Sequence, residues 1–315
     1  MKSDSRALSF WMVAGVFFAF SQPRTSAEEP SIRRPDSNTV ILVAEEMTFR
    51  RISPARYGKT ENDFFLQTTE VANAAFARFL NDTGQLKMDS WMARTQRDRR
   101  EQERRTGVMR RSTTDAGAVI RNEALLWDYN QPPPGKERYP VALVDYLEAR
   151  EFCQWLGRRY PKVGRFRLPN KQEWMVAAYG SGRNYPWGDQ WNPEIPWVSA
   201  TSDRSEPVAV NLPTRDQTPE GICHLWGNLT EWSLGYWDEP FEIWPTGVPK
   251  SLGDTAFMGP SFASRSQPSQ WLKPRQDYWG FVHNPLSRSE ETGFRVLLVP
   301  SANLTNSTSL TAPAR

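Results

Sequence analysis

A chain of 315 residues is long enough for one large domain or two smaller ones. Its 14 Trp and 16 Phe exclude a disordered protein, because disordered chains are depleted in aromatic residues, while its 25 Pro indicate a backbone rich in loops. The net charge of +3 is too small to favour a nucleic-acid partner.

Residues 1–27 have the three parts of a secretory signal peptide. Lys2 and Arg6 supply positive charge, Ala7–Phe20 is mostly apolar, and Thr25–Ala27 offers small residues for cleavage. The apolar run is short for a membrane span, although an uncleaved anchor is the alternative. We therefore expect an exported protein, periplasmic or extracellular, whose mature form does not span a membrane and carries a net charge of about +1.

After a linker at 28–37, short apolar elements alternate with turns. Apolar runs fit for strands are Thr39–Glu45, Asp63–Thr69, Tyr139–Val144 and Gly293–Val299. Apolar residues at helical spacing predict helices over Glu70–Leu80 and Asp145–Leu156. A further helix follows Phe166–Pro169, because Asn170 can cap it and Glu173 completes a capping box.

Two segments are expected to lie outside the core. Residues 85–138 resemble an insertion, in which Arg94–Arg111 contains eight Arg and few apolar residues. This stretch could dock an acidic partner, but a solvated helix or loop is the simpler interpretation. The polar residues 301–315 predict a disordered tail.

The stretch Thr218–Trp232 poses a chemical question. Glu231 lies between Trp-containing segments, so its carboxylate needs a cation, an Arg or a metal ion as a partner. The chain has only two His, His224 and His283, which argues against a zinc or non-haem iron site built on several His. Its only two Cys, Cys153 and Cys223, fit either one disulfide or two buried thiols.

Several motifs in one order resemble the formylglycine-generating enzyme, or sulfatase-modifying factor, family. They are Glu70–Asn73, Tyr139–Val141, Glu148–Gly157, Arg167–Pro169 with Glu173–Trp174, Tyr185–Asp189, Gly227–Trp232 and Gly293–Arg295. The resemblance covers residues 38–300 apart from the Arg-rich insertion. It implies an α+β fold: a single C-type-lectin-like domain with little regular secondary structure, short twisted antiparallel sheets and a few helices.

The resemblance also implies a copper site that this sequence has lost. Oxidase members of the family bind copper(I) through two Cys, which match Ser264 and Ser269 in the segment Met258–Ser269. Copper(I) prefers soft thiolates, and neutral hydroxyls are poor replacements. We therefore expect neither copper binding nor formylglycine formation. Cys153 matches a position that in some relatives bonds a Cys at the position of Val296, so we favour two free thiols here.

Relatives hold calcium around the segment that contains Glu231. Here the matching ligands are His224, Gly227, Leu229 and Glu231, of which Gly227 and Leu229 would offer backbone carbonyls. Because calcium prefers oxygen ligands, the imidazole of His224 makes the site doubtful. In the alternative interpretation, His224 or a buried Arg such as Arg295 neutralises Glu231, which then acts only as a structural pin.

Two functions remain open. The first is a non-catalytic binding or structural assembly factor for a protein, peptide or glycan, with a groove lined by aromatic residues (Trp237, Trp244, Trp271, Tyr278 and Trp279). The second is an exported enzyme with divergent oxidative chemistry at the former copper site, as in pyoverdine chromophore maturation. Its candidate catalytic groups are Ser264, Arg265, Ser269, Tyr278, His283 and Arg288. We favour the first.

Overall fold

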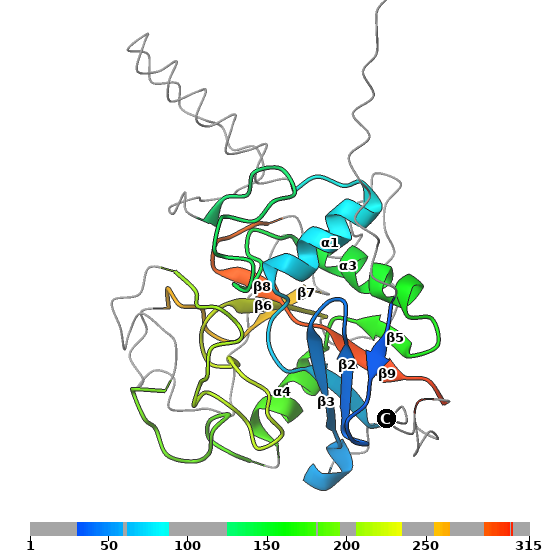
Figure 1. Ribbon diagram of the computed structural model, residues 1–315. Helices are drawn as coiled ribbons and strands as arrows, with labels where there is room; N and C mark the ends of the chain where they lie inside the picture. The colour runs from blue at the N-terminus through cyan, green and yellow to red at the C-terminus, as the bar shows by residue number, and fades with distance from the viewer. Residues whose placement is uncertain are drawn as a thin grey trace, which may run out of the picture.

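The fold is α+β, with two small sheets and a few helices (Figure 1). The computed structural model describes residues 30–58, 62–87, 125–180, 182–195, 206–234, 255–264, 287–302 and 304. None of the helices in these ranges is long and apolar enough to cross a membrane. The signal peptide predicted at residues 1–27 lies outside them.

The larger sheet has six antiparallel strands in the order β1-β2-β3-β4-β9-β5. Their bounds are β1 Ile32–Arg33, β2 Thr39–Leu42, β3 Met47–Ile52, β4 Phe64–Gln67, β9 Leu297–Pro300 and β5 Gly164–Arg167. Because β1 pairs with β2, the sheet begins inside the stretch expected to be a linker. The sequence analysis did not identify β3, whose alternating pattern includes the two Arg of Met47–Ile52.

Both faces of this sheet are covered, so β4 is buried along its whole length. Phe65 of β4 and Leu298 of β9 pack in one core cluster with residues of the helices Asn73–Thr83 (α1) and Tyr146–Arg159 (α3). Phe64 and Leu66 point to the opposite face, where they pack with the helix Lys171–Tyr179 (α4). The alternation follows from the two-residue period of side chains along a strand.

The smaller sheet has the strand order β7-β6-β8. Its strands are β6 Thr230–Leu234, β7 Thr255–Met258 and β8 Thr292–Phe294; β6 pairs with β7 in antiparallel fashion and with β8 in parallel fashion. The prediction of a single strand over Gly293–Val299 is therefore wrong. The chain passes from β8 in one sheet to β9 in the other, and Arg295 lies at the break.

Two of the helices begin at a capping box. Asp145 caps α3 through a capping box with Glu148, and Asn170 caps α4 through a capping box with Glu173. α1 begins three residues later than the predicted helix, which included Glu70. A short 3-10 helix spans Pro54–Tyr57, and the run Tyr139–Val144 forms one isolated bridge, between Pro140 and Ala72, instead of a strand.

The two segments expected outside the core are partly in it. Lys87, Leu125 and Trp127, at the two ends of the predicted insertion, are buried. Leu304, in the predicted tail, is also buried in the main core cluster. The Arg-rich stretch itself, and the tail beyond Leu304, lie outside the described residues.

Candidate functional site

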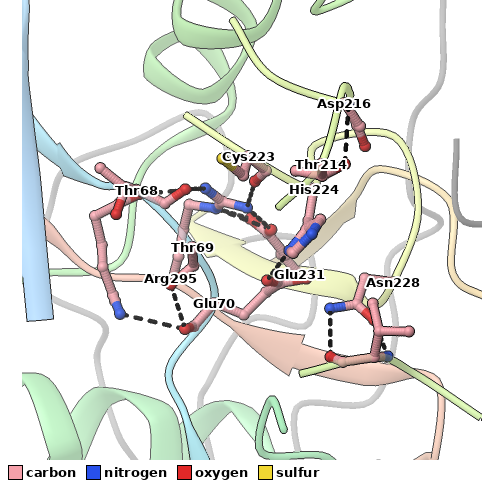
Figure 2. Close-up of polar contacts among 12 residues, drawn as sticks. Thr68, Thr69, Glu70, Thr214, Asp216, Cys223, His224, Asn228, Glu231 and Arg295 are labelled. Atoms are coloured by element: carbon pink, nitrogen blue, oxygen red, sulfur yellow. Dashed lines mark hydrogen bonds and ion pairs between the residues drawn. The ribbon is translucent and has the colours of Figure 1, made fainter. Parts of the chain in front are cut away.

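Arg295 is the centre of a buried polar cluster at the junction of the two sheets (Figure 2). Its Nε lies 2.9 and 2.7 Å from the two carboxylate oxygens of Glu231, and its Nη2 lies 2.5 Å from Oε1. The remaining N–H groups donate to backbone carbonyls of Cys223, Gln67 and Thr68. The guanidinium thus joins β6, the end of β4 and the loop before β6.

Glu231 also connects this cluster to α4. The indole Nε1 of Trp174 donates to Glu231 Oε2 at 3.0 Å. Glu231 is 1% exposed and Arg295 is fully buried, so the pair has no access to solvent that could replace a lost partner. A buried carboxylate in this position requires such a set of donors to remain charged.

His224 forms the second ion pair of the cluster. Its Nδ1 lies 3.2 Å from Oε2 of Glu70, and both side chains are buried. Burial lowers the pKa of His224, but the carboxylates of Glu70 and Asp216 raise it, and the net shift is upward. Burial raises the pKa of Glu70, but His224 lowers it, and the net shift is downward. Both shifts favour a charged pair.

Asp216 is a third acid of the cluster, and like Glu70 it has one buried oxygen without a hydrogen-bond partner among the described residues. One of its oxygens, Oδ2, accepts from the backbone N–H of Trp226, while Oδ1 is buried and accepts from no described residue. Burial raises the pKa of Asp216 to about 6, although His224 and the Trp226 N–H oppose the shift. This carboxyl group therefore titrates in a mildly acidic range.

The predicted calcium ligands lie close together in the sequence, but their donor atoms do not fit calcium. Both oxygens of Glu231 accept from Arg295, and His224 binds Glu70 through nitrogen. Within the described part of the chain, no group of three or more His, Cys, Asp and Glu side chains could hold a metal ion. The sequence analysis named this pairing of Glu231 with Arg295 as one alternative to a calcium site.

The positions of Gly227 and Leu229 serve packing. Gly227 and the residue after it, Asn228, both have positive φ, of 149° and 62°. The Asn228 side chain bonds the N–H and the carbonyl of Val208, and its own carbonyl accepts from Phe262 N–H at 2.8 Å. Leu229 is buried beside Phe262. This turn therefore holds the start of the segment that matches the copper site.

In that segment, Ser264 belongs to a turn stabilised by hydroxyl groups. Its Oγ accepts from the N–H of Ser261 at 3.0 Å, and the Ser261 hydroxyl donates to Glu291 at 2.8 Å. Gly259 has φ of 75°, and a Cβ there would lie 2.9 Å from the carbonyl of Leu225, so glycine is required. The resulting donor set offers hydroxyls and a carboxylate, which do not fit copper(I).

Of the other candidate catalytic groups, Arg288 is the one whose contacts the structure defines. It binds Asp145 at 2.6 Å and Glu148 at 3.2 Å, and thereby ties the start of α3 to the segment before β8. The remaining candidates, Arg265, Ser269, Tyr278 and His283, lie outside the described residues. So do the predicted groove residues Trp237, Trp244, Trp271, Tyr278 and Trp279.

Both Cys are free thiols. Cys153 is buried on α3 in the core cluster that also contains Val296, and burial raises its pKa. Cys223 is half-buried, and burial raises its pKa to about 11. Neither thiol lies in the copper-matching segment, and neither is a thiolate at neutral pH.

The buried charged residues that the sequence analysis did not identify include Glu70, Asp216 and Lys87. Glu70 was assigned to the first turn of a helix, and Asp216 was not singled out. Lys87 lies at the edge of the predicted insertion, where its Nζ donates to the carbonyls of Ala142 and Leu143. Nothing in the local sequence distinguishes these charged residues from solvated ones.

A family model described as "Sulfatase-modifying factor enzyme 1-like domain" matches residues 29–299. The inactive C-alpha-formylglycine-generating enzyme 2 of Bos taurus is 30% identical over 139 residues, which cover 37% of this chain and 44% of that protein. The formylglycine-generating enzyme of Mus musculus is 24% identical over 220 residues, with 63% and 55% covered.

Hercynine oxygenase of Mycobacterium tuberculosis is 26% identical over 191 residues, which cover 59% of this chain and 40% of that protein. The chain thus spans about half the length of the curated relatives that it matches. Among solved structures, PvdO from Pseudomonas aeruginosa aligns with a TM-score of 0.48 and 15% identity, with 86% of this chain and 99% of that chain covered.

Proposed function

Because this chain belongs to the sulfatase-modifying factor family, we propose that it is an exported binding or assembly factor that lacks the copper oxidase chemistry of the family. The proposal rests on the side chains that the copper-matching segment offers as metal ligands. Copper(I) needs thiolates, and the described start of the matching segment contains the hydroxyls of Ser261 and Ser264 instead.

The two thiols of the chain do not compensate for this loss. Cys153 is buried in the main core cluster, whereas Cys223 lies in the polar cluster, where its carbonyl accepts from Arg295. Both thiols have raised pKa values, so they resist the deprotonation that copper(I) binding requires. A relative whose name marks it as inactive supports the same interpretation.

A copper competition experiment tests the proposal. The purified mature protein, titrated with copper(I) against a chromophoric chelator, is expected to take up no stoichiometric metal. Incubated with a Cys-containing sulfatase peptide and oxygen, it is expected to leave the peptide mass unchanged. Tight one-to-one copper uptake, or conversion of the peptide Cys to formylglycine, would overturn the proposal.

The double variant Ser264→Cys/Ser269→Cys provides a positive control. If these positions are those of the lost ligands, the variant gains copper(I) affinity because two thiolates are restored. The single variant Ser264→Cys is the matched control, since it adds a thiol without completing the pair. Comparison of the three proteins separates the loss of two ligand residues from a general inability of the fold to hold copper.

A second function is supported by the hydroxyl groups of the same segment. Ser264 bonds Ser261, whose hydroxyl donates to Glu291, so a carboxylate and two hydroxyls lie together there. An exported enzyme with oxidative chemistry unlike that of the copper oxidases could use these groups, and one relative is named as an oxygenase. A siderophore biosynthesis cluster beside the gene would favour this enzyme, whereas a surface-assembly operon would favour the binding factor.

A further inference from the structure

We propose that a cavity between the β2–β3 turn and α1 binds small carboxylate ligands, with Arg78 as the anchor. The inference rests on the proposed binding function and names the class of ligand that one site takes. The cavity has a volume of about 330 Å³ and is lined by the β2–β3 turn, the segment from β4 into α1, and residues 137–138 and 210–211. Figure 1 shows the β2–β3 turn pointing toward α1.

The first half of α1 forms one wall of this cavity. Ala74, Ala75 and Arg78 line it, and residues three and four positions apart share a face of a helix. The two Ala side chains leave space, whereas Arg78 is the long cationic side chain of that face. A cavity of this volume is at the lower end of the range for small-molecule sites.

Arg78 has no partner within the described chain. Its Nε is buried and donates no hydrogen bond, and the guanidinium makes neither a hydrogen bond nor an ion pair with any described residue. By contrast, Arg159, Arg288 and Arg295 all bind carboxylates. A buried N–H without an acceptor is costly, and a carboxylate that accepts two parallel hydrogen bonds is the natural complement of a guanidinium.

The acidic residues around the cavity do not supply that carboxylate. Glu45 accepts from Arg159 and from the hydroxyl of Tyr160, and Glu70 pairs with His224. Glu137 is exposed and accepts from the N–H of Gly135. Glu45 and Glu70 therefore have partners of their own, and the Glu137 carboxylate is exposed, so none of the three acids pairs with Arg78.

A second cation stands at the edge of the cavity. Arg138 pairs with Glu46, and the two side chains are 54% and 61% exposed. An ion pair this exposed contributes little and exchanges partners readily. A ligand with two carboxylates can therefore bind Arg78 inside and Arg138 at the rim, so succinate is a suitable probe.

Calorimetric titration of the mature protein with succinate at constant ionic strength tests the proposal. We expect one site with a Kd on the order of 1 mM, typical of a small ligand held by a few charged contacts. The variant Arg78→Gln is expected to weaken binding about tenfold or more. Arg78→Lys keeps the charge but loses the planar fork, so it should retain only part of the affinity. Arg158→Gln, an exposed Arg on α3, is the matched control and should bind as the unmodified chain does.

Three results would overturn the inference. They are the absence of binding at tens of millimolar succinate, equal binding by Arg78→Gln, and equal affinity for sulfate, which would show attraction by charge alone. Thermal unfolding of each variant, run in parallel, identifies a loss of folding. Copper uptake plays no part in this titration, so failure here and failure of the proposed function can be told apart.

Discussion

Glu231 and Arg295 form an ion pair that is hidden from solvent and joins the two sheets: Glu231 lies in β6, and Arg295 lies where the chain leaves β8 for β9. Each carboxylate oxygen accepts from the guanidinium, which also donates to three backbone carbonyls. The pair stands where the family resemblance implies a calcium ion. Both oxygens of Glu231 are thus bonded to a cation of the chain itself.

Replacing Arg295 with Met should destabilise the protein strongly. The substitution leaves Glu231 buried without its cation and leaves carbonyl groups of Gln67 and Cys223 without a donor. Removal of one partner of a buried pair costs about 3–5 kcal/mol, which urea unfolding monitored by tryptophan fluorescence can measure. Arg158→Met on the exposed face of α3 is the control, with an expected change within about 0.5 kcal/mol.

A double variant separates the missing charge from the missing packing. In Arg295→Met/Glu231→Gln the buried negative charge is gone, so part of the stability lost in Arg295→Met should return. If the double variant instead lost the sum of the two single losses, the two side chains would act independently. That outcome would contradict the pairing as the source of the stability.

Titration of Asp216 should make the free energy of unfolding depend on pH. Its pKa in the folded protein is about 6, above the value of about 3.9 for an exposed Asp, so the unfolded chain loses the proton first as pH rises. Between these values the folded state binds more protons, and its stability falls with rising pH. Asp216→Asn should remove this decline, which is worth about 3 kcal/mol by the linkage relation.

Urea unfolding at several pH values, compared between Asp216→Asn and the unmodified chain, checks this expectation. The comparison is needed because Glu70 titrates with the opposite sign: its pKa is lowered, so its contribution is lost as pH falls. Parallel stability profiles for the two proteins from pH 4 to about 7 would show that Asp216 does not titrate as its burial implies.

Local interactions could be predicted from the sequence, whereas long-range ones could not. The capping box of Asn170 and Glu173 spans three residues, and its donors and acceptors follow from the helix that they begin. Glu70 and His224 are 154 residues apart, and nothing near either residue indicates the other. Their pairing also explains why α1 starts later than its apolar pattern suggests, since Glu70 is held in the buried cluster.

The partner of Glu231 could be predicted only in part from the sequence. The Trp-rich surroundings of Glu231 predicted a buried carboxylate that needs a cation, and Arg295 was one of the candidates named. The choice depends on the break between β8 and β9, which the apolar run Gly293–Val299 conceals because both strands are buried. Hydrophobic patterning reports burial but does not show that a chain changes sheets.

Addition of calcium should leave the melting temperature of the purified protein unchanged. The oxygens of Glu231 already accept from Arg295, and an imidazole nitrogen is a poor calcium ligand, so the ion has no ready site around His224. Differential scanning fluorimetry at millimolar calcium, with Glu231→Gln measured in parallel, checks this. A clear rise that disappears in Glu231→Gln would establish calcium binding at this position and refute the expectation.

The two thiols should react slowly in the folded protein and completely in the unfolded one. Cys153 is buried, and Cys223 is half-buried with a pKa of about 11, so little thiolate exists at neutral pH. Titration with a disulfide reagent in denaturant, without reduction, should find both thiols. In the folded protein the residual reaction should come from Cys223 and rise about tenfold per pH unit, because the thiolate is the reactive form. Cys223→Ser should abolish that reaction and Cys153→Ser should preserve it; fewer than two thiols in the unfolded, unreduced chain would instead reveal a disulfide.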